Sequence, residues 1–338
     1  MQGCTRLAAP SASRCYRPIV PSFAFVFPGQ GSQYIGMGRA LAEHSPAAAE
    51  VFNEADIVLG EPLSRLCFEG PAEQLDQTVN SQPAILATSI AYLRALEEWF
   101  GNDSPAVAPA FFAGHSMGQY SALVAAQVIN LADGLRLVRE RGRQMQASAE
   151  DGSMAAIIGL PDDQLDALEA AGRASGIFTI ANRNSPGQIV VSGERAAVAA
   201  AADKAKELGA RRAIVLPVSV AAHSPLMSRA AEGMSKVLAD VKFNDPRAPL
   251  LANADARPLT TGEGCRAELV EHLTRGVDWV AAVERMTSAG VEAFTEVGPG
   301  KVLTGLIKRI APDAQSLALD DQSAPGGLAI PQILTATT

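Results

Sequence analysis

Short apolar runs alternate with amphipathic stretches along most of the chain. Phe23 to Phe27 is a run of apolar residues that ends at a Pro-Gly pair, which predicts a buried strand and then a turn. Pro46 to Leu59 and Pro83 to Phe100 have the apolar spacing of helices, and a further helix is expected over Leu131 to Ala149. The run Ala106 to Phe112 predicts another strand. This alternation is typical of a parallel sheet with helices on its faces.

The order of elements changes between Gly152 and Pro217. The pattern there predicts strand, helix, two strands, helix and strand, over Met154–Gly159, Asp162–Ala174, Phe178–Asn182, Gln188–Ser192, Glu194–Leu208 and Arg212–Leu216. This β-α-β-β-α-β order is that of a ferredoxin-like unit. We therefore predict an α/β fold in which residues 152–217 form a small subdomain inserted into a large α/β domain of residues 23–151 and 218–315. Residues 1–22 are expected to be an N-terminal extension and residues 316–338 a loose C-terminal tail.

Composition excludes several classes of function. The 338 residues carry 36 acidic against 28 basic side chains, a net charge of −8, which argues against general nucleic-acid binding. The chain contains no uninterrupted apolar stretch of about 18 residues or more, so we expect no membrane span. The four cysteines and four histidines lack metal-ligand spacing, and we expect reduced thiols and neither a metal nor a redox cofactor.

Residues 1–22 differ from the rest of the chain because they hold Arg6, Arg14 and Arg17 but no acidic residue. Such a composition suits an organelle transit peptide, a disordered extension, or a start codon placed too far upstream. We expect a cytoplasmic protein, with a mitochondrial or plastid location as the alternative if this segment is a transit peptide.

Gly114-His115-Ser116-Met117-Gly118 lies between a predicted strand and a helix-like stretch, Ser121 to Ala126. A serine in this G-x-S-x-G context lies on a sharp turn with its hydroxyl exposed, and the helix that follows directs its positive end toward that hydroxyl. The pattern therefore predicts that Ser116 is a nucleophile, although a glycine-rich turn without catalytic function has the same pattern.

An activated serine needs a base, and His223 is the best candidate among the histidines. It follows the apolar, strand-like run Pro217 to Ala222, whereas His115 lies at the turn entry and His44 in a polar segment. An oxyanion also needs N–H donors. Met117 supplies one by its position after the serine, and the loop of residues 28–33 after the first strand is suited to supply the other. This loop lacks both the phosphate-loop and the complete dinucleotide-binding signatures.

Arg141 lies in a charged helical stretch and is followed by Gly142, which would leave room for a ligand. A guanidinium offers a planar, bidentate site for a carboxylate. A solvated helix face is the alternative for this arginine.

Eight blocks of the sequence together resemble one family. They are FVFPGQGSQYIGMG, QPAILATSIA, GHSMGQYSALVAA, LVRERGRQM, GSMAAIIGL, NRNSPGQIVVSG, LPVSVAAHSPLM and EVGPGKVLTGLIKRI. In this order and spacing, from Phe23 to Ile310, they resemble the malonyl-CoA:acyl-carrier-protein transacylases of fatty-acid synthesis, which are relatives of polyketide synthase acyltransferase domains. The resemblance implies an α/β-hydrolase-like large domain with a ferredoxin-like small one.

The resemblance also implies a role for each site residue. Ser116 would be the nucleophile and His223 its general base, oriented by main-chain carbonyls instead of an acidic side chain. Gln30 and Met117 would supply the oxyanion N–H groups, and Arg141 would bind the free carboxylate of the malonyl group.

Three positions depart from the family pattern. Gln119 stands where a glutamate is usual, His272 where glutamine is frequent, and Ala222 where relatives tend to carry Ser or Phe. These three residues, together with Asn182, are candidates for lining or tuning the pocket. The small side chain of Ala222 leaves both malonyl and methylmalonyl groups open as substrates.

The implied reaction is a two-step, ping-pong acyl transfer from a coenzyme A thioester to acyl carrier protein, with no cofactor. Carrier proteins are acidic, so Lys301, Lys308 and Arg309 are candidates for carrier docking, with a solvated helix face as the alternative. We expect a monomer. The alternatives are a serine acyl hydrolase, a non-catalytic docking module, and a stand-alone acyltransferase that serves a polyketide synthase.

Overall fold

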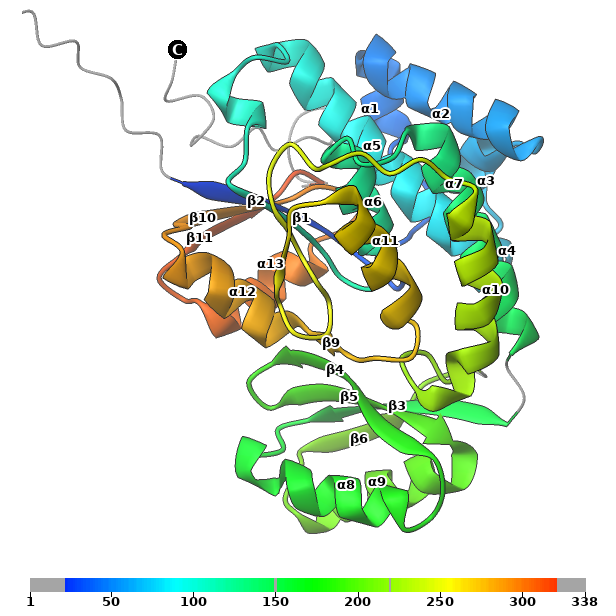
Figure 1. Ribbon diagram of the computed structural model, residues 1–338, viewed down its shortest axis with the longest axis vertical. Coiled ribbons are helices and arrows are strands. Elements are labelled where there is room, and N and C mark those ends of the chain that lie inside the picture. The colour runs from blue at the N-terminus through cyan, green and yellow to red at the C-terminus, as the bar shows by residue number, and fades with distance from the viewer. Residues whose placement is uncertain (1–21, 149–150, 219, 321–338) are drawn as a thin grey trace, which may run out of the picture.

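The computed structural model describes residues 22–148, 151–218 and 220–320, and within them two separate sheets. Figure 1 shows the larger sheet, flanked by most of the helices, above the smaller one. The larger sheet has the order β11-β10-β1-β2-β7-β8, formed by Gln315–Ala318, Ala293–Glu296, Phe23–Phe27, Phe111–Gly114, Leu250–Leu251 and Pro258–Leu259. All its strand pairs are parallel except β7 with β8.

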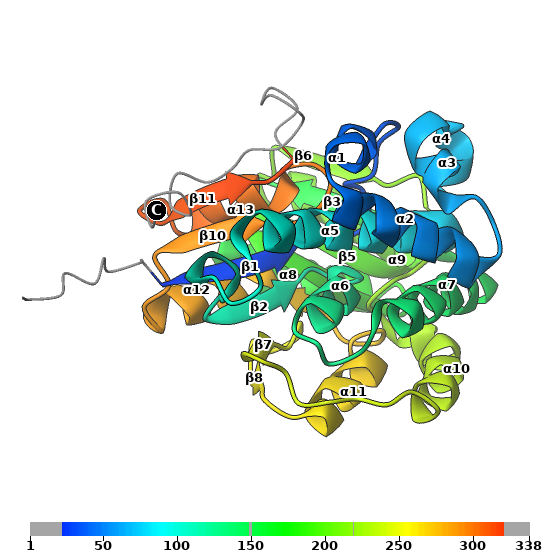
Figure 2. The same cartoon turned by 90° about the horizontal axis from the view of Figure 1, so that it is seen from above.

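Strand β1 is buried on both faces, which explains why its sequence is continuously apolar. Phe23, Phe25 and Phe27 pack into one core, while Ala24 and Val26 pack into another on the opposite face. The first core includes helices α1 (Arg39–His44), α2 (Pro46–Leu59), α3 (Leu63–Glu69), α4 (Ala72–Leu75), α5 (Thr78–Phe100), α6 (Gly118–Ala125), α7 (Leu131–Ala147), α10 (Ser228–Ala239) and α11 (Gly262–Glu271). The second is formed with α12 (Trp279–Ser288) and α13 (Val302–Ile310). Figure 2 shows this layering from above.

The smaller sheet has the order β6-β3-β5-β4-β9. Its elements are β3 (Gly152–Ile158), α8 (Leu165–Arg173), β4 (Phe178–Ser185), β5 (Gln188–Glu194), α9 (Arg195–Glu207), β6 (Arg212–Val215) and β9 (Val277–Asp278). Helices α8 and α9 pack on one face through a core that includes Ile157, Leu168 and Val198. Strand β9 comes from beyond residue 217 and pairs with β4, so the later part of the chain contributes an edge strand to this sheet.

The predicted α/β fold class is confirmed, and three local predictions are wrong. Residues 105–107 form a 3-10 turn and the strand begins only at Phe111, because Pro105 and Pro109 lack the N–H that a strand ladder needs. The described part of residues 217–222 forms no strand. The expected tail begins inside β11, which pairs with β10. The predicted N-terminal extension up to residue 21, and the tail after Asp320, lie outside the described residues.

Candidate active site

Ser116 lies on a tight turn between β2 and α6. Its φ of +52° is in the left-handed region, which is strained for a residue with a side chain. Two glycines allow the turn: a Cβ on Gly114 would lie 2.1 Å from the backbone of Gly118, and one on Gly118 would lie 2.2 Å from the carbonyl oxygen of Phe27. Strand, turn and helix therefore approach one another so closely that neither glycine can carry a side chain.

His223 is the hydrogen-bond partner of the serine. Its Nε2 lies 2.8 Å from Ser116 Oγ, and its Nδ1 lies 2.7 Å from the carbonyl oxygen of His272 and 3.0 Å from that of Arg275. Because only a protonated Nδ1 can donate to carbonyls, these contacts favour the tautomer with an unprotonated Nε2 facing the serine. Two main-chain carbonyls thus occupy the place that an acidic side chain takes in a Ser-His-Asp triad.

The pKa of His223 is lowered to about 4, chiefly by burial and then by the charge of Arg141. The imidazole is therefore neutral near pH 7 and able to accept a proton. His223 lies on a turn with a φ of +59°, and not at the end of the strand that the sequence suggested.

Arg141, on α7, is buried with 2% of its surface exposed. Its Nη2 donates a hydrogen bond to Ser116 Oγ over 3.1 Å, and its guanidinium lies 5.9 Å from the ring centre of Tyr120. Burial lowers the pKa of Arg141, and among the described residues no carboxylate forms an ion pair with it. A buried cation without an acidic partner beside a nucleophile is suited to bind an anionic substrate group.

The sequence suggested that Gly142 leaves room for a ligand beside Arg141. The structure shows instead that this glycine packs against another helix. A Cβ at this position would lie 2.8 Å from Val79 Cα and 3.0 Å from the carbonyl oxygen of Thr78. The glycine therefore allows α7 to approach the first turn of α5.

The main-chain amides of Met117 and Gln30 are candidates for the oxyanion hole. Within the described residues, neither N–H donates a hydrogen bond, whereas the Ser116 N–H donates to Asn253 Oδ1 over 2.8 Å. The loop that carries Gln30 packs on the serine turn, since a Cβ on Gly29 would lie 2.6 Å from the carbonyl oxygen of His115. Two free donors thus lie on segments that meet at the serine.

The remaining candidates take different positions. Gln119 is fully buried, and its side chain donates to the carbonyl oxygen of Leu251 and accepts from Asn253. The ring of His272 is buried, with its centre 6.0 Å from that of the His223 ring, and neither of its nitrogens has a hydrogen-bond partner among the residues that the structure describes. Ala222 packs against the larger core.

Three further observations concern the small sheet and the exposed basic residues of α13 and the residue before it. Asn182 on β4 has a buried Oδ1 with no hydrogen-bond partner in the described part of the chain. Two residues on, Asn184 Oδ1 lies 2.8 Å from His115 Nε2, which joins the serine turn to the small sheet. Lys301, Lys308 and Arg309 are exposed, and Arg309 donates to the side chain of Gln188 on β5.

Sequence reasoning missed Asn253, which the structure places directly against the serine turn. It is a single asparagine in a segment without other chemical signals, LANADA, and its partners lie more than a hundred residues away. No spacing rule connects positions so far apart.

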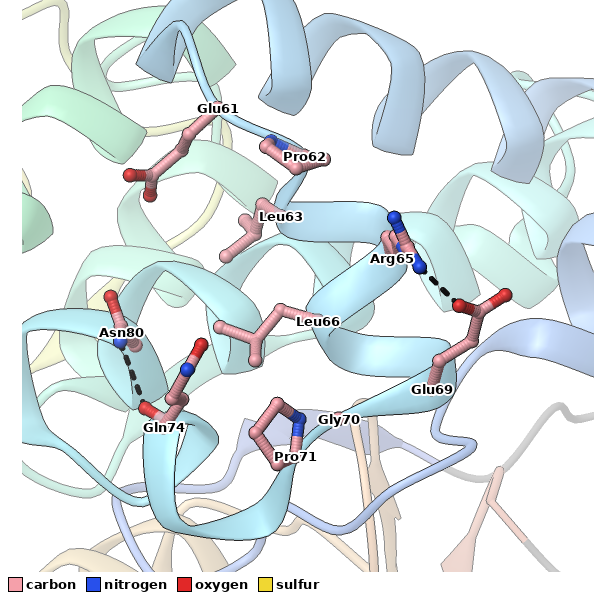
Figure 3. A pocket seen from close by; sticks show the side chains of 10 residues that line it. All are labelled: Glu61, Pro62, Leu63, Arg65, Leu66, Glu69, Gly70, Pro71, Gln74 and Asn80. Carbon is pink, nitrogen blue, oxygen red and sulfur yellow. Dashed lines mark hydrogen bonds and ion pairs between the residues drawn. The ribbon is translucent and has the colours of Figure 1, made fainter.

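A cavity of about 590 Å³ lies away from these residues, between α3, α4 and the start of α5. Figure 3 shows its lining, in which Arg65 pairs with Glu69 and Asn80 bonds the backbone of Gln74. None of the predicted site residues lines it, and its acidic and basic groups are already paired with neighbours, Glu61 with Arg139 among them.

Over the described ranges, no three His, Cys, Asp or Glu side chains are grouped as metal ligands would be. No helix in the same part of the chain has the length and apolarity that crossing a bilayer requires.

Comparisons with known proteins identify the family. Residues 24–319 match the acyl transferase domain family. The malonyl CoA-acyl carrier protein transacylase of Escherichia coli strain K12 is 46% identical over 305 residues, covering 89% of this chain and 97% of the relative. Its counterpart from Bacillus subtilis is 42% identical, with 88% and 93% covered. The crystal structure of an acyl-carrier-protein S-malonyltransferase from Bartonella henselae superposes with a TM-score of 0.86 at 42% identity, with 93% and 98% covered.

A malonyl-transacylase in complex with a type II polyketide synthase acyl-carrier protein has a TM-score of 0.84 at 40% identity, covering 94% of this chain and 98% of that one. The family match extends over nearly all the described residues, including both sheets and every residue of the Ser116 site. This chain belongs to the acyl transferase domain family.

Proposed function

We propose that this protein transfers a malonyl group from malonyl-CoA to the phosphopantetheine thiol of acyl carrier protein, through a malonyl ester on Ser116. The observation that carries the proposal is the position of one hydroxyl: Ser116 Oγ lies 2.8 Å from His223 Nε2 and 3.1 Å from Arg141 Nη2. A base and a buried cation on the same hydroxyl suit acyl transfer from a substrate with a free carboxylate.

In the first half-reaction, Ser116 Oγ attacks the thioester carbonyl carbon while its proton passes to His223 Nε2. The oxyanion forms in reach of the Met117 and Gln30 N–H groups. As it collapses, the C–S bond breaks and the His223 proton goes to the departing coenzyme A sulfur, which leaves malonyl-Ser116. The second half-reaction is the reverse, with the carrier thiol attacking the ester and Ser116 regaining its proton.

Arg141 selects the acyl group in this scheme. A malonyl carboxylate satisfies the buried guanidinium, while an acetyl group leaves it unpaired, and an unpaired buried charge is costly. The carboxylate also reduces the influence of the Arg141 charge on His223, which makes the imidazole more basic once substrate is bound.

Two named relatives support the carrier as partner. The Escherichia coli relative is a transacylase acting on acyl carrier protein, and a structural neighbour is in complex with a polyketide synthase carrier. We favour supply of extender units for fatty-acid synthesis, with supply of a polyketide synthase as the alternative. A monomeric, cytoplasmic enzyme is part of this proposal.

The test is mass spectrometry of the intact protein after brief incubation with malonyl-, methylmalonyl- or acetyl-CoA, with and without holo acyl carrier protein. We expect a malonyl adduct on Ser116 that moves to the carrier. Release of free malonate without transfer would instead indicate a hydrolase, and an equal methylmalonyl adduct would indicate an extender range typical of polyketide enzymes.

A further inference from the structure

Asn253 forms a buried bridge to the backbone of the serine turn. It follows strand β7, has 4% of its surface exposed, and accepts the Ser116 N–H on its Oδ1 over 2.8 Å. On the other side of its amide, Nδ2 donates to the carbonyl oxygen of Gly114 over 3.1 Å and to Gln119 Oε1 over 3.0 Å. One side chain thus bonds the residues before, at and after the turn.

The amide can do this in one orientation only. Ser116 offers a donor, while Gly114 and Gln119 offer acceptors, so the oxygen and nitrogen of the Asn253 amide cannot exchange places without losing all three bonds. A leucine of similar size would make none of them.

The backbone of Asn253 is itself fixed on both sides. Its N–H donates to Glu268 Oε1 over 2.7 Å, and its carbonyl oxygen accepts from the Asp278 N–H over 2.7 Å. Glu268 is buried, with 1% of its side chain exposed, and its other oxygen lies 3.2 Å from Arg257 Nη2. The bridge is therefore anchored to α11 and to the start of α12.

Gln119 completes the arrangement from the helix side. Its Oε1 accepts from Asn253 and its Nε2 donates to the carbonyl oxygen of Leu251 over 3.1 Å. An ionised glutamate here could accept from Asn253 but could not donate to Leu251. The amide at this position consequently ties the first turn of α6 to strand β7.

These contacts act on a strained backbone. Ser116 has a φ of +52°, a conformation that persists only where neighbouring groups hold it. The bond to Asn253 also occupies the Ser116 N–H, which leaves the Met117 N–H as the turn's free donor.

We propose that Asn253 is a positioning residue for the nucleophile, which holds the Ser116 backbone through its amide and is itself held by Gln119 and Glu268. This inference rests on the proposed function, because its readout is acylation of Ser116. Asn253 acts before the substrate arrives, so it sets the rate of ester formation and not the affinity for the thioester.

The test compares the wild type with Asn253→Leu, Gln119→Leu and Gln119→Glu. The acylation rate constant of Ser116 is measured by quenched-flow mass spectrometry at saturating malonyl-CoA. The dissociation constant of malonyl-CoA is measured in the same variants with Ser116→Ala added. Ser45→Ala is the matched control, since Ser45, the residue before α2, is buried and bonds Glu98 near the end of α5, away from the turn.

For Asn253→Leu we expect acylation to slow by about 100-fold, the scale of a small misplacement of a reacting group. Gln119→Leu should slow it less, and Gln119→Glu less again, while the dissociation constant stays within about twofold throughout. Ser45→Ala should acylate like the wild type. If Asn253→Leu does not fold, the acylation rates of the two Gln119 variants test the inference in its place.

Acylation at the wild-type rate in the folded variants would overturn the inference, as would a parallel loss of rate and of thioester affinity. A wild-type protein that forms no malonyl-Ser116 would overturn the proposed function instead, so the two failures are distinguishable.

Discussion

Arg141 Nη2 and His223 Nε2 both contact the single hydroxyl of Ser116, at 3.1 and 2.8 Å. The cation on α7 and the base after β6 come from different parts of the chain and meet at the serine turn. In the proposed mechanism, the charge on the arginine consequently affects both the choice of acyl group and the basicity of the histidine.

Replacing Arg141 should change the preference for malonyl-CoA over acetyl-CoA more than it changes the rate of acyl transfer from a thioester without a carboxylate. For Arg141→Ala we expect kcat/KM with malonyl-CoA to fall on the order of 100-fold, because the substrate carboxylate loses a buried charged partner. The rate with acetyl-CoA should fall much less, or rise. Steady-state assays with both thioesters measure the ratio of kcat/KM for malonyl-CoA to kcat/KM for acetyl-CoA.

Arg143→Ala is the control for this change. It lies on the same helix but is exposed and pairs only with Glu140 among the residues described, so its selectivity should equal that of the wild type. An unchanged malonyl preference in Arg141→Ala would contradict the role given to Arg141.

The reactivity of Ser116 should persist at low pH. Burial and the Arg141 charge hold the pKa of His223 at about 4, below the ordinary 6.5, so the imidazole stays neutral as the pH falls through 6.5 and protonates only near 4. Modification of Ser116 by a neutral sulfonyl fluoride should therefore be constant above about pH 6 and half-maximal near pH 4.

In Arg141→Met the midpoint should move to higher pH, because a positive neighbour that disfavours the imidazolium is gone. A midpoint near 6.5 in the wild type, or one that does not respond to Arg141→Met, would contradict the electrostatic argument.

Gly118→Ala should disrupt the fold around the serine turn. The added Cβ would lie 2.2 Å from the Phe27 carbonyl oxygen and 2.8 Å from that of Pro28, and backbone atoms cannot move aside as the end of a flexible side chain can. We expect a loss of stability of several kcal/mol, or insoluble protein, on the scale of overpacking against fixed backbone. Chemical denaturation measures it.

Gly305→Ala is the matched control on helix α13, where an added methyl group would have no atom of the described residues within 4 Å apart from its own helix backbone and chain neighbours. That change should leave stability unaltered or raise it by about 0.5–1 kcal/mol. Equal stabilities of the two alanine variants would refute the packing argument.

Charge reversal at Lys301, Lys308 and Arg309 should affect only the second half-reaction. All three side chains are exposed, Arg309 beside Gln188 of the small sheet, and an acidic carrier would be repelled by glutamates at these positions. We expect the KM for the carrier to rise several-fold at low salt, which corresponds to a loss of roughly 1 kcal/mol of binding free energy. The effect should be smaller at high salt. Acylation by malonyl-CoA should be unchanged.

Lys206→Glu on α9 makes one such charge reversal, against three in the docking variant, on an exposed side chain elsewhere. It should leave the KM for the carrier close to the wild-type value. If the triple variant and this control behave alike, the three residues do not form the docking surface.

Local patterns were sufficient for much of this site. The apolar run of β1 and the glycines on either side of the serine depend on neighbours in sequence, and both were predicted. The residue pattern favoured His223 as the base, and the resemblance supplied the role of Arg141 beside Ser116, which no spacing rule fixes. Asn253 was missed because its three bonds cross more than a hundred residues. The strand expected before His223 was wrong, since the described residues of that apolar run form no strand.

Both members of the Ser116–His223 pair adopt a left-handed backbone, with φ of +52° and +59°. A side chain in this region costs about 1–2 kcal/mol, a penalty that glycine avoids. Alanine ordinarily stabilises a protein more than glycine does, and this order should be reversed at position 116. Of two inactive variants, Ser116→Gly should melt at a higher temperature than Ser116→Ala. In the proposed mechanism, the two residues that react are therefore also residues that lower the protein's resistance to unfolding, and selection for heat tolerance alone would favour replacing them.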